Sequence, residues 1–117
     1  MQSIIMAVPI LPGKTESLKA MFKTVKEEKW KDYERVQKKS GIEKERDFLQ
    51  MTPMGDMLLI YMESKDIQKT FASFLTSKDP FDIWYIEEIK KNTGVDFSQP
   101  SSGPLPELLV SYDKPIL

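Results

Sequence analysis

The sequence predicts one α+β domain in which a small antiparallel sheet carries its helices on one face. Two observations support this class. The run from Asp56 to Glu63 holds six apolar residues between two carboxylates, which is short for a helix and typical of a buried strand. Apolar strands and helical patterns also follow one another in the order β-α-β-β-α-β, so two crossovers return the chain to one sheet.

Composition restricts the chemistry that the chain can use. Its 117 residues suffice for one hydrophobic core, and a net charge of −1 gives no reason to expect a nucleic acid. The absence of histidine and cysteine excludes disulfides, thiolate zinc sites, cysteine nucleophiles and Ser-His-Asp catalysis. No run approaches the roughly 20 apolar residues that cross a bilayer, and no signal peptide is evident. We therefore predict a cytoplasmic protein without a metal or cofactor.

The first part of the chain predicts a strand followed by a long helix. Residues 3–11 are almost wholly apolar up to Pro12-Gly13, which indicates a strand buried on both faces. Thr15 is a suitable N-cap, apolar residues then recur at helical spacing as far as Val36, and Gly41 is a natural helix end. The many lysines of this region favour a solvated helix face, with a surface for anions or nucleic acid as the alternative.

The middle of the chain predicts a bend and a hairpin. Trp30 lies off the apolar stripe, so either the helix bends near Lys29 or the indole covers a second surface. Residues 43–52 predict a second strand, which opens with the charged run Glu43-Lys44-Glu45-Arg46-Asp47. The turn Pro53-Met54-Gly55-Asp56 then leads into the central strand as an antiparallel hairpin.

The second half of the chain predicts two helices and a last strand. Asp66 caps a short helix, and Asp79-Pro80 starts another that is apolar over more than one stripe and ends at Gly94. A loop rich in Ser, Pro and Gly follows, residues 108–112 predict the last strand, and residues 113–117 a loose tail.

This order of elements is the ferredoxin-like split β-α-β arrangement, which places both helical layers on one face of a four-stranded antiparallel sheet. The other face then carries Ile, Leu, Met, Val and Tyr without a cover. Open apolar surface of this kind is usually a contact surface. We therefore predict a homodimer through the open sheet face, with two sheets packed about a two-fold axis as a barrel-like core.

Three short motifs stand at informative places: Pro12-Gly13-Lys14 after the first strand, Glu45-Arg46 entering the second, and Pro80-Phe81-Asp82-Ile83-Trp84 in the later helix. With the order of elements, they resemble the dimeric α+β barrel superfamily, and more narrowly a family of small bacterial and archaeal proteins of unknown function. The resemblance spans about residues 4–112. In that pattern a histidine follows the tryptophan, and this chain has Tyr85 there. No histidine-based activity or iron ligation is therefore carried over.

The resemblance implies a pocket between the sheet and the helices of each subunit. Asp82 and Tyr85, at positions i and i+3 of one helix, are the candidates for proton transfer. Arg46 would hold an anion in bidentate fashion or pair with Asp82. The other candidates for ligand binding are Trp30, Tyr33, Glu45 and Trp84. The structural alternative makes Trp84 a core residue and Asp82 a charge at a helix start.

These observations favour a homodimeric small-molecule-binding protein, with a small organic acid as its possible ligand. The alternative is a cofactor-independent enzyme, similar to a monooxygenase or an isomerase, that acts on a small aromatic or conjugated acid. A third hypothesis is an anion or nucleic-acid binder that uses the helical lysines. We expect no nucleic-acid partner and no membrane association.

Overall fold

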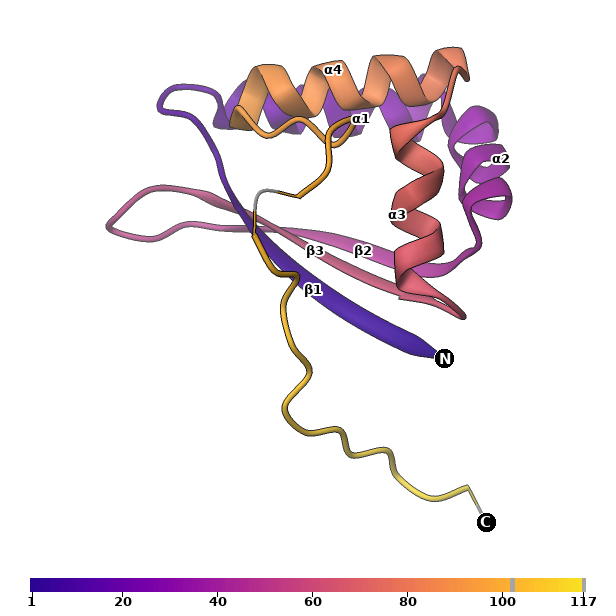
Figure 1. Ribbon diagram of the computed structural model, residues 1–117. Coiled ribbons are helices and arrows are strands. Elements are labelled where there is room, and N and C mark those ends of the chain that lie inside the picture. Colours follow the sequence, from indigo (N-terminus) through magenta and orange to yellow (C-terminus); the bar gives the residue numbers. More distant parts are fainter. Residues whose placement is uncertain (102, 117) are drawn as a thin grey trace.

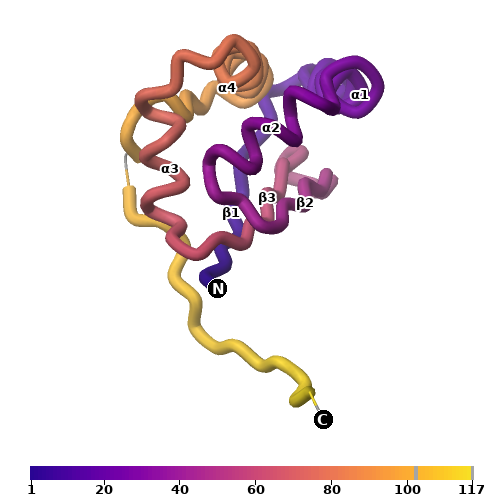
Figure 2. Tube along the Cα trace, turned by 90° about the vertical axis from the view of Figure 1, so that its right-hand side faces the viewer, coloured from indigo at the N-terminus to yellow at the C-terminus, as the bar shows by residue number. Residues whose placement is uncertain are grey.

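The computed structural model describes residues 1–101 and 103–116. Within them the elements follow the order β1 (Gln2–Pro9), α1 (Thr15–Glu28), α2 (Trp30–Ser40), β2 (Ile42–Gln50), β3 (Met57–Ser64), α3 (Ile67–Leu75) and α4 (Pro80–Thr93). Figure 1 shows these helices on one side of a twisted sheet, and Figure 2 shows the same two layers from another direction. The predicted α+β class is confirmed.

The sheet is antiparallel and is built around β3. Within the described residues it has three strands in the order β1-β3-β2. The predicted hairpin joins β2 to β3, and in its turn the Thr52 hydroxyl donates a hydrogen bond of 2.6 Å to the carbonyl oxygen of Gly55. This arrangement is compatible with a ferredoxin-like fold.

The strand predicted at Leu108–Tyr112 is not part of this sheet. Residues 104–116 run away from the body of the molecule, and the large apolar side chains among them are exposed (Figure 1). A strand needs a neighbouring edge for its backbone groups, and this segment does not pair with β1 or β2. The order of elements in one chain is therefore β-α-α-β-β-α-α, rather than the full β-α-β-β-α-β.

The two faces of the sheet differ in burial. On β3 the side chains that point toward the helices, Leu58, Ile60 and Met62, are buried. Leu59 and Tyr61 alternate with them, point to the outer face and are only partly covered. On β1, Ile4 and Val8 are buried, whereas Ile5 on the outer face is 53% exposed. The prediction that these strands are buried on both faces is therefore met on the helix side only.

Local capping signals determine several helix ends. The carboxylate of Asp66 accepts a hydrogen bond from the N–H of Lys69 at the start of α3, and Asp79 caps α4 in the same way. Gly41 and Gly94 end α2 and α4 with backbone φ angles of 82° and 78°, which residues other than glycine rarely adopt. These predicted boundaries are confirmed.

The predicted long helix is two helices. The helix is interrupted at Lys29, whose N–H donates a hydrogen bond to the Thr24 carbonyl oxygen, and α2 begins at Trp30. Of the two alternatives for this region, the structure shows the one with a bend near Lys29. The predicted N-cap is wrong: Thr15 is already the first helical residue, and its hydroxyl donates to the Asp56 carboxylate at 2.6 Å. That bond ties the start of α1 to the loop before β3.

Candidate functional site

An open groove of about 650 Å³ lies between α1 and the strands β2 and β3. Its apolar wall is formed by Leu18, Phe22, Val25 and Leu58. Its exposed rim carries Lys19, Lys23, Lys26 and Trp30, and its polar floor is made by Tyr33, Glu45 and Asp47. A space of this size, with apolar walls and a few convergent polar groups, is typical of a small-molecule site.

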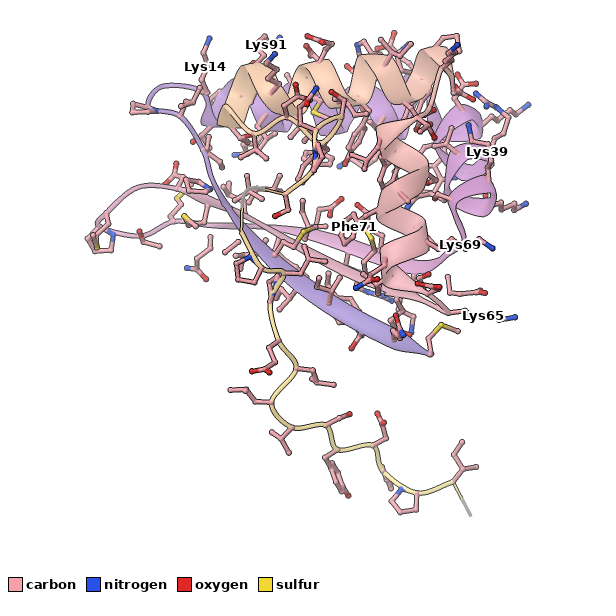
Figure 3. The ribbon with its side chains drawn as sticks, viewed as in Figure 1. Lys14, Lys39, Lys65, Lys69, Phe71 and Lys91 are labelled. Atoms are coloured by element: carbon pink, nitrogen blue, oxygen red, sulfur yellow. The ribbon has the colours of Figure 1, made fainter. Side chains whose placement is uncertain are left out.

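A smaller cavity of about 50 Å³ lies deeper, between the sheet and helices α2, α3 and α4. Tyr33 and Glu45 line both spaces, so they stand between the groove and the cavity. Asp82, Tyr85 and Phe71 also line the cavity, and Figure 3 shows Phe71 on the side of α3 toward the sheet. The cavity has room for roughly three water molecules.

Strand β2 turns two of its acidic side chains, Glu45 and Asp47, toward the helices. Glu45 pairs in register with Met62 and Asp47 with Ile60, and both of these β3 residues point toward the helices. Arg46 lies between them and pairs with Tyr61, so it points to the outer face. The sheet therefore separates Arg46 from Asp82, and the predicted pairing of these two residues is wrong.

Asp47 is the most strongly perturbed acid of the groove. Burial, reinforced by the neighbouring Glu45 carboxylate, raises the pKa of Asp47 to about 9. Its Oδ1 atom is buried and has no hydrogen-bond partner among the described residues. The raised pKa favours the protonated form of the Asp47 carboxyl near neutral pH, and the Oδ1 atom is open to a further hydrogen bond.

Two phenols and an amide complete the polar part of the site. The Gln37 amide donates to the Tyr33 hydroxyl at 3.1 Å and to the Glu45 carboxylate at 2.8 Å. Tyr33 and Tyr85 are stacked, with ring centroids 6.5 Å apart. Burial, followed by the charges of Glu45 and Asp47, raises the pKa of both tyrosines above its ordinary value. Both phenols therefore keep their protons at neutral pH.

Asp82 is held by groups at the end of the helical layer. It is 5% exposed, accepts a hydrogen bond from the Ser77 hydroxyl, and lies 3.6 Å from the Lys39 ammonium. It also stands in the first turn of α4, where the helix dipole favours a negative charge. These contacts favour the structural alternative for Asp82, although the residue borders the deep cavity.

The two tryptophans have different surroundings. Trp30 is 47% exposed at the rim of the groove and packs on Tyr33, with ring centroids 5.2 Å apart. Trp84 packs on Phe81 and under the Lys29 ammonium, 4.9 Å from its ring. Trp84 lines neither the groove nor the cavity; instead it joins α4 to the break between α1 and α2.

Of the predicted site residues, the structure thus brings together Trp30, Tyr33, Glu45, Asp82 and Tyr85, and it leaves Arg46 and Trp84 outside. Asp47 and Gln37 belong to the site and were not predicted. The alternation of acidic and basic residues from Glu43 to Asp47 is the signal for Asp47, since period two places Glu45 and Asp47 on one face. No local pattern indicates Gln37.

Within residues 1–101 and 103–116, no three His, Cys, Asp or Glu side chains are grouped so that they could hold a metal ion. In the same part of the chain, every helix is too short or too polar to pass through a membrane. Comparisons with protein-family models, curated proteins and solved structures found no match to this chain.

Proposed function

We propose that the protein binds a small organic molecule in the groove between α1 and β2. The observation that supports this most directly is the buried Asp47 carboxyl, which is protonated at neutral pH and leaves an oxygen without a partner. Buried polar groups are normally hydrogen-bonded, so an unpartnered one at the floor of a groove indicates a place for a ligand.

The lining indicates the chemistry of the ligand. Phe22 and Trp30 offer aromatic surface, which suits a flat apolar body. Protonated Asp47 donates a hydrogen bond, which suits a carbonyl or hydroxyl oxygen at the inner end. Lys19 and Lys23 on the rim suit a carboxylate at the outer end. A small aromatic or conjugated acid combines these features, with lysine rather than Arg46 as its anchor.

The proposal includes a homodimer through the open sheet face. Ile5 and Phe48 on that face are 53% and 54% exposed, and Leu59 and Tyr61 lie between them on β3. Apolar side chains on the uncovered side of three adjacent strands form a patch that a second copy of the same face would bury.

Binding is tested by thermal shift and calorimetry with a series of small aromatic acids. We expect at least one to stabilise the protein, and Asp47→Ala to weaken its binding about tenfold, which is the free energy of one hydrogen bond. The matched control is Glu87→Ala, an exposed carboxylate on α4 that is outside the groove. Equal binding by wild type, Asp47→Ala and Trp30→Ala would exclude this site.

The second candidate is an isomerase-like enzyme that moves a proton without a cofactor. It is favoured by the adjacent carboxyl groups of Asp47 and Glu45, since burial and the neighbouring Glu45 raise the pKa of Asp47 and the pair can hold and transfer one proton. Asp47→Asn retains a hydrogen-bond donor and lacks the acidic proton. We therefore expect this variant to bind the ligand and to lose hydrogen–deuterium exchange at the ligand carbon by about a hundredfold or more. Exchange by Asp47→Asn at the wild-type rate would leave only the binding function.

A further inference from the structure

Residues 104–116 form a C-terminal arm whose large apolar side chains are exposed to solvent. Leu109, Val110 and Tyr112 are 86%, 83% and 82% exposed, and Ile116 is 99% exposed. Figures 1 and 2 show the arm leaving the body, and Figure 3 shows its side chains apart from the rest of the chain. Consecutive large apolar side chains in water indicate a surface that a partner covers.

The arm has the composition of a strand. Leu108, Val110 and Tyr112 alternate along it, so they share one face when the segment is extended. Pro104 and Pro106 precede them and favour an extended approach, because proline restricts its own φ angle and the residue before it. An arm held extended in this way loses less conformational entropy when it docks.

The sheet has a place for such a strand. Among the described residues β1 is paired on one side only, with β3, so its other edge presents backbone N–H and C=O groups. This is also the position that a fourth strand occupies in the ferredoxin-like order. The chain's own arm does not take that position, because it passes β1 and continues beyond the outer face (Figure 1).

The arm is long enough to reach a second copy. Its 13 residues span roughly 40 Å when extended, whereas two sheets packed face to face lie roughly 10 Å apart. It also leaves on the side of the sheet away from the helices, which is where the second copy of the proposed dimer would lie (Figures 1 and 2).

We propose that two copies of this chain exchange their C-terminal arms, each arm adding a strand to the free edge of β1 in the other copy. The exchange completes a four-stranded sheet in each copy and covers the apolar side chains of the arm. This inference rests on the dimer of the proposed function and is independent of its ligand.

Disulfide trapping tests the exchange in the full-length chain, which has no cysteine of its own. Each chain carries one introduced cysteine. The Ala7→Cys variant, on β1, is mixed with the Leu108→Cys, Val110→Cys or Tyr112→Cys variant, and the mixture is oxidised. We expect a disulfide-linked heterodimer for at least one arm position, since paired strands bring Cα atoms within bonding range. The matched control, Glu87→Cys on the exposed face of α4 in place of Ala7→Cys, is expected to give none.

Light scattering separates failure of the exchange from failure of the dimer. Wild type is expected at twice the 13.6 kDa chain mass, and Val110→Asp, which changes a side chain that is exposed in one copy, at the single-chain mass. A wild-type dimer that gives no cross-link and survives Val110→Asp would overturn the exchange and keep the dimer. A monomeric wild type at every concentration would overturn both. An intramolecular disulfide in a chain carrying both Ala7→Cys and Val110→Cys would show that the arm pairs with its own β1.

Discussion

Arg46 and Asp47 are neighbours in the chain and belong to opposite sides of the sheet. Arg46 points outward beside Tyr61, whereas Asp47 points inward beside Glu45, is half-buried and has its Oδ1 atom shielded from water. The same β2 segment therefore supplies a charge to the outer face and a protonated acid to the groove. A shift of register by one residue would exchange these roles, because strand side chains alternate between the faces.

The raised pKa of Asp47 predicts how the stability of the fold depends on pH. Asp47 has an ordinary pKa of about 4 when unfolded and about 9 when folded, so the native state retains a proton that the unfolded chain releases. Its stabilising contribution is complete below about pH 4 and is lost as the pH rises through about 9. Asp47→Asn should therefore raise the free energy of unfolding at pH 8 by about 2 kcal/mol or more.

Urea denaturation of both proteins from pH 5 to pH 9 measures this effect. The stability of wild type should fall relative to that of Asp47→Asn across this range, while Asp113→Asn, which changes an exposed carboxylate of the arm, should follow wild type. Parallel curves for wild type and Asp47→Asn would show that the Asp47 carboxyl is ionised in the native state.

At the scale of elements, a buried hydroxyl joins α3 to its neighbours. The Thr70 hydroxyl donates to the Ser40 carbonyl oxygen at the end of α2, at 2.9 Å, and lies 2.8 Å from the Ser64 hydroxyl at the end of β3. Thr70 and Ser64 are 1% and 2% exposed, so water does not replace either bond. Three elements that are distant in sequence therefore meet at one side chain.

Thr70→Val tests this junction. It keeps the shape of the side chain, removes the hydroxyl that donates to the Ser40 carbonyl, and leaves the Ser64 hydroxyl with only its hydrogen bond from the Asp66 N–H. We therefore expect a loss of about 1–3 kcal/mol in the free energy of unfolding. Thr76→Val, an exposed threonine just after α3, is the control and should change stability by less than about 0.5 kcal/mol. Chemical denaturation followed by circular dichroism measures both values. Equal free energies of unfolding for Thr70→Val and wild type would show that the junction does not stabilise the fold.

At the level of the whole molecule, a lysine substitution should have different effects on the two faces of the sheet. Ile60 is 5% exposed and points toward the helices, whereas Ile5 is 53% exposed on the outer face. A lysine at position 60 would bury a charge within the core, which should prevent folding. A lysine at position 5 should leave the fold of the chain intact and separate the proposed dimer.

Circular dichroism and light scattering of Ile5→Lys and Ile60→Lys check this prediction. Ile5→Lys is expected to keep a folded spectrum with half the wild-type mass, and Ile60→Lys to lose the folded spectrum. A dimeric Ile5→Lys protein would mean that the outer face is not the contact surface, and that a dimer, if present, uses another part of the chain.

The elements that sequence predicted well depend on residues close together in the chain. The caps at Asp66 and Asp79, the glycine ends at Gly41 and Gly94 and the hairpin turn are each determined by a few neighbouring side chains and backbone angles. The candidate site was predicted in part, because Tyr33, Glu45 and Tyr85 converge only when α2, β2 and α4 pack together.

By itself the sequence determined the α+β class, the helix ends marked by Gly41, Asp66, Asp79 and Gly94, and the apolar character of both sheet faces, since these follow from local backbone preferences and side-chain periodicity. The tertiary structure decided that Arg46 and Asp82 lie on opposite sides of the sheet and that Asp47 is the acid whose pKa is raised. It also decided that residues 108–112 do not join the sheet. The physical reason is that pairing, burial and pKa depend on which distant segments meet, and local sequence does not carry that information.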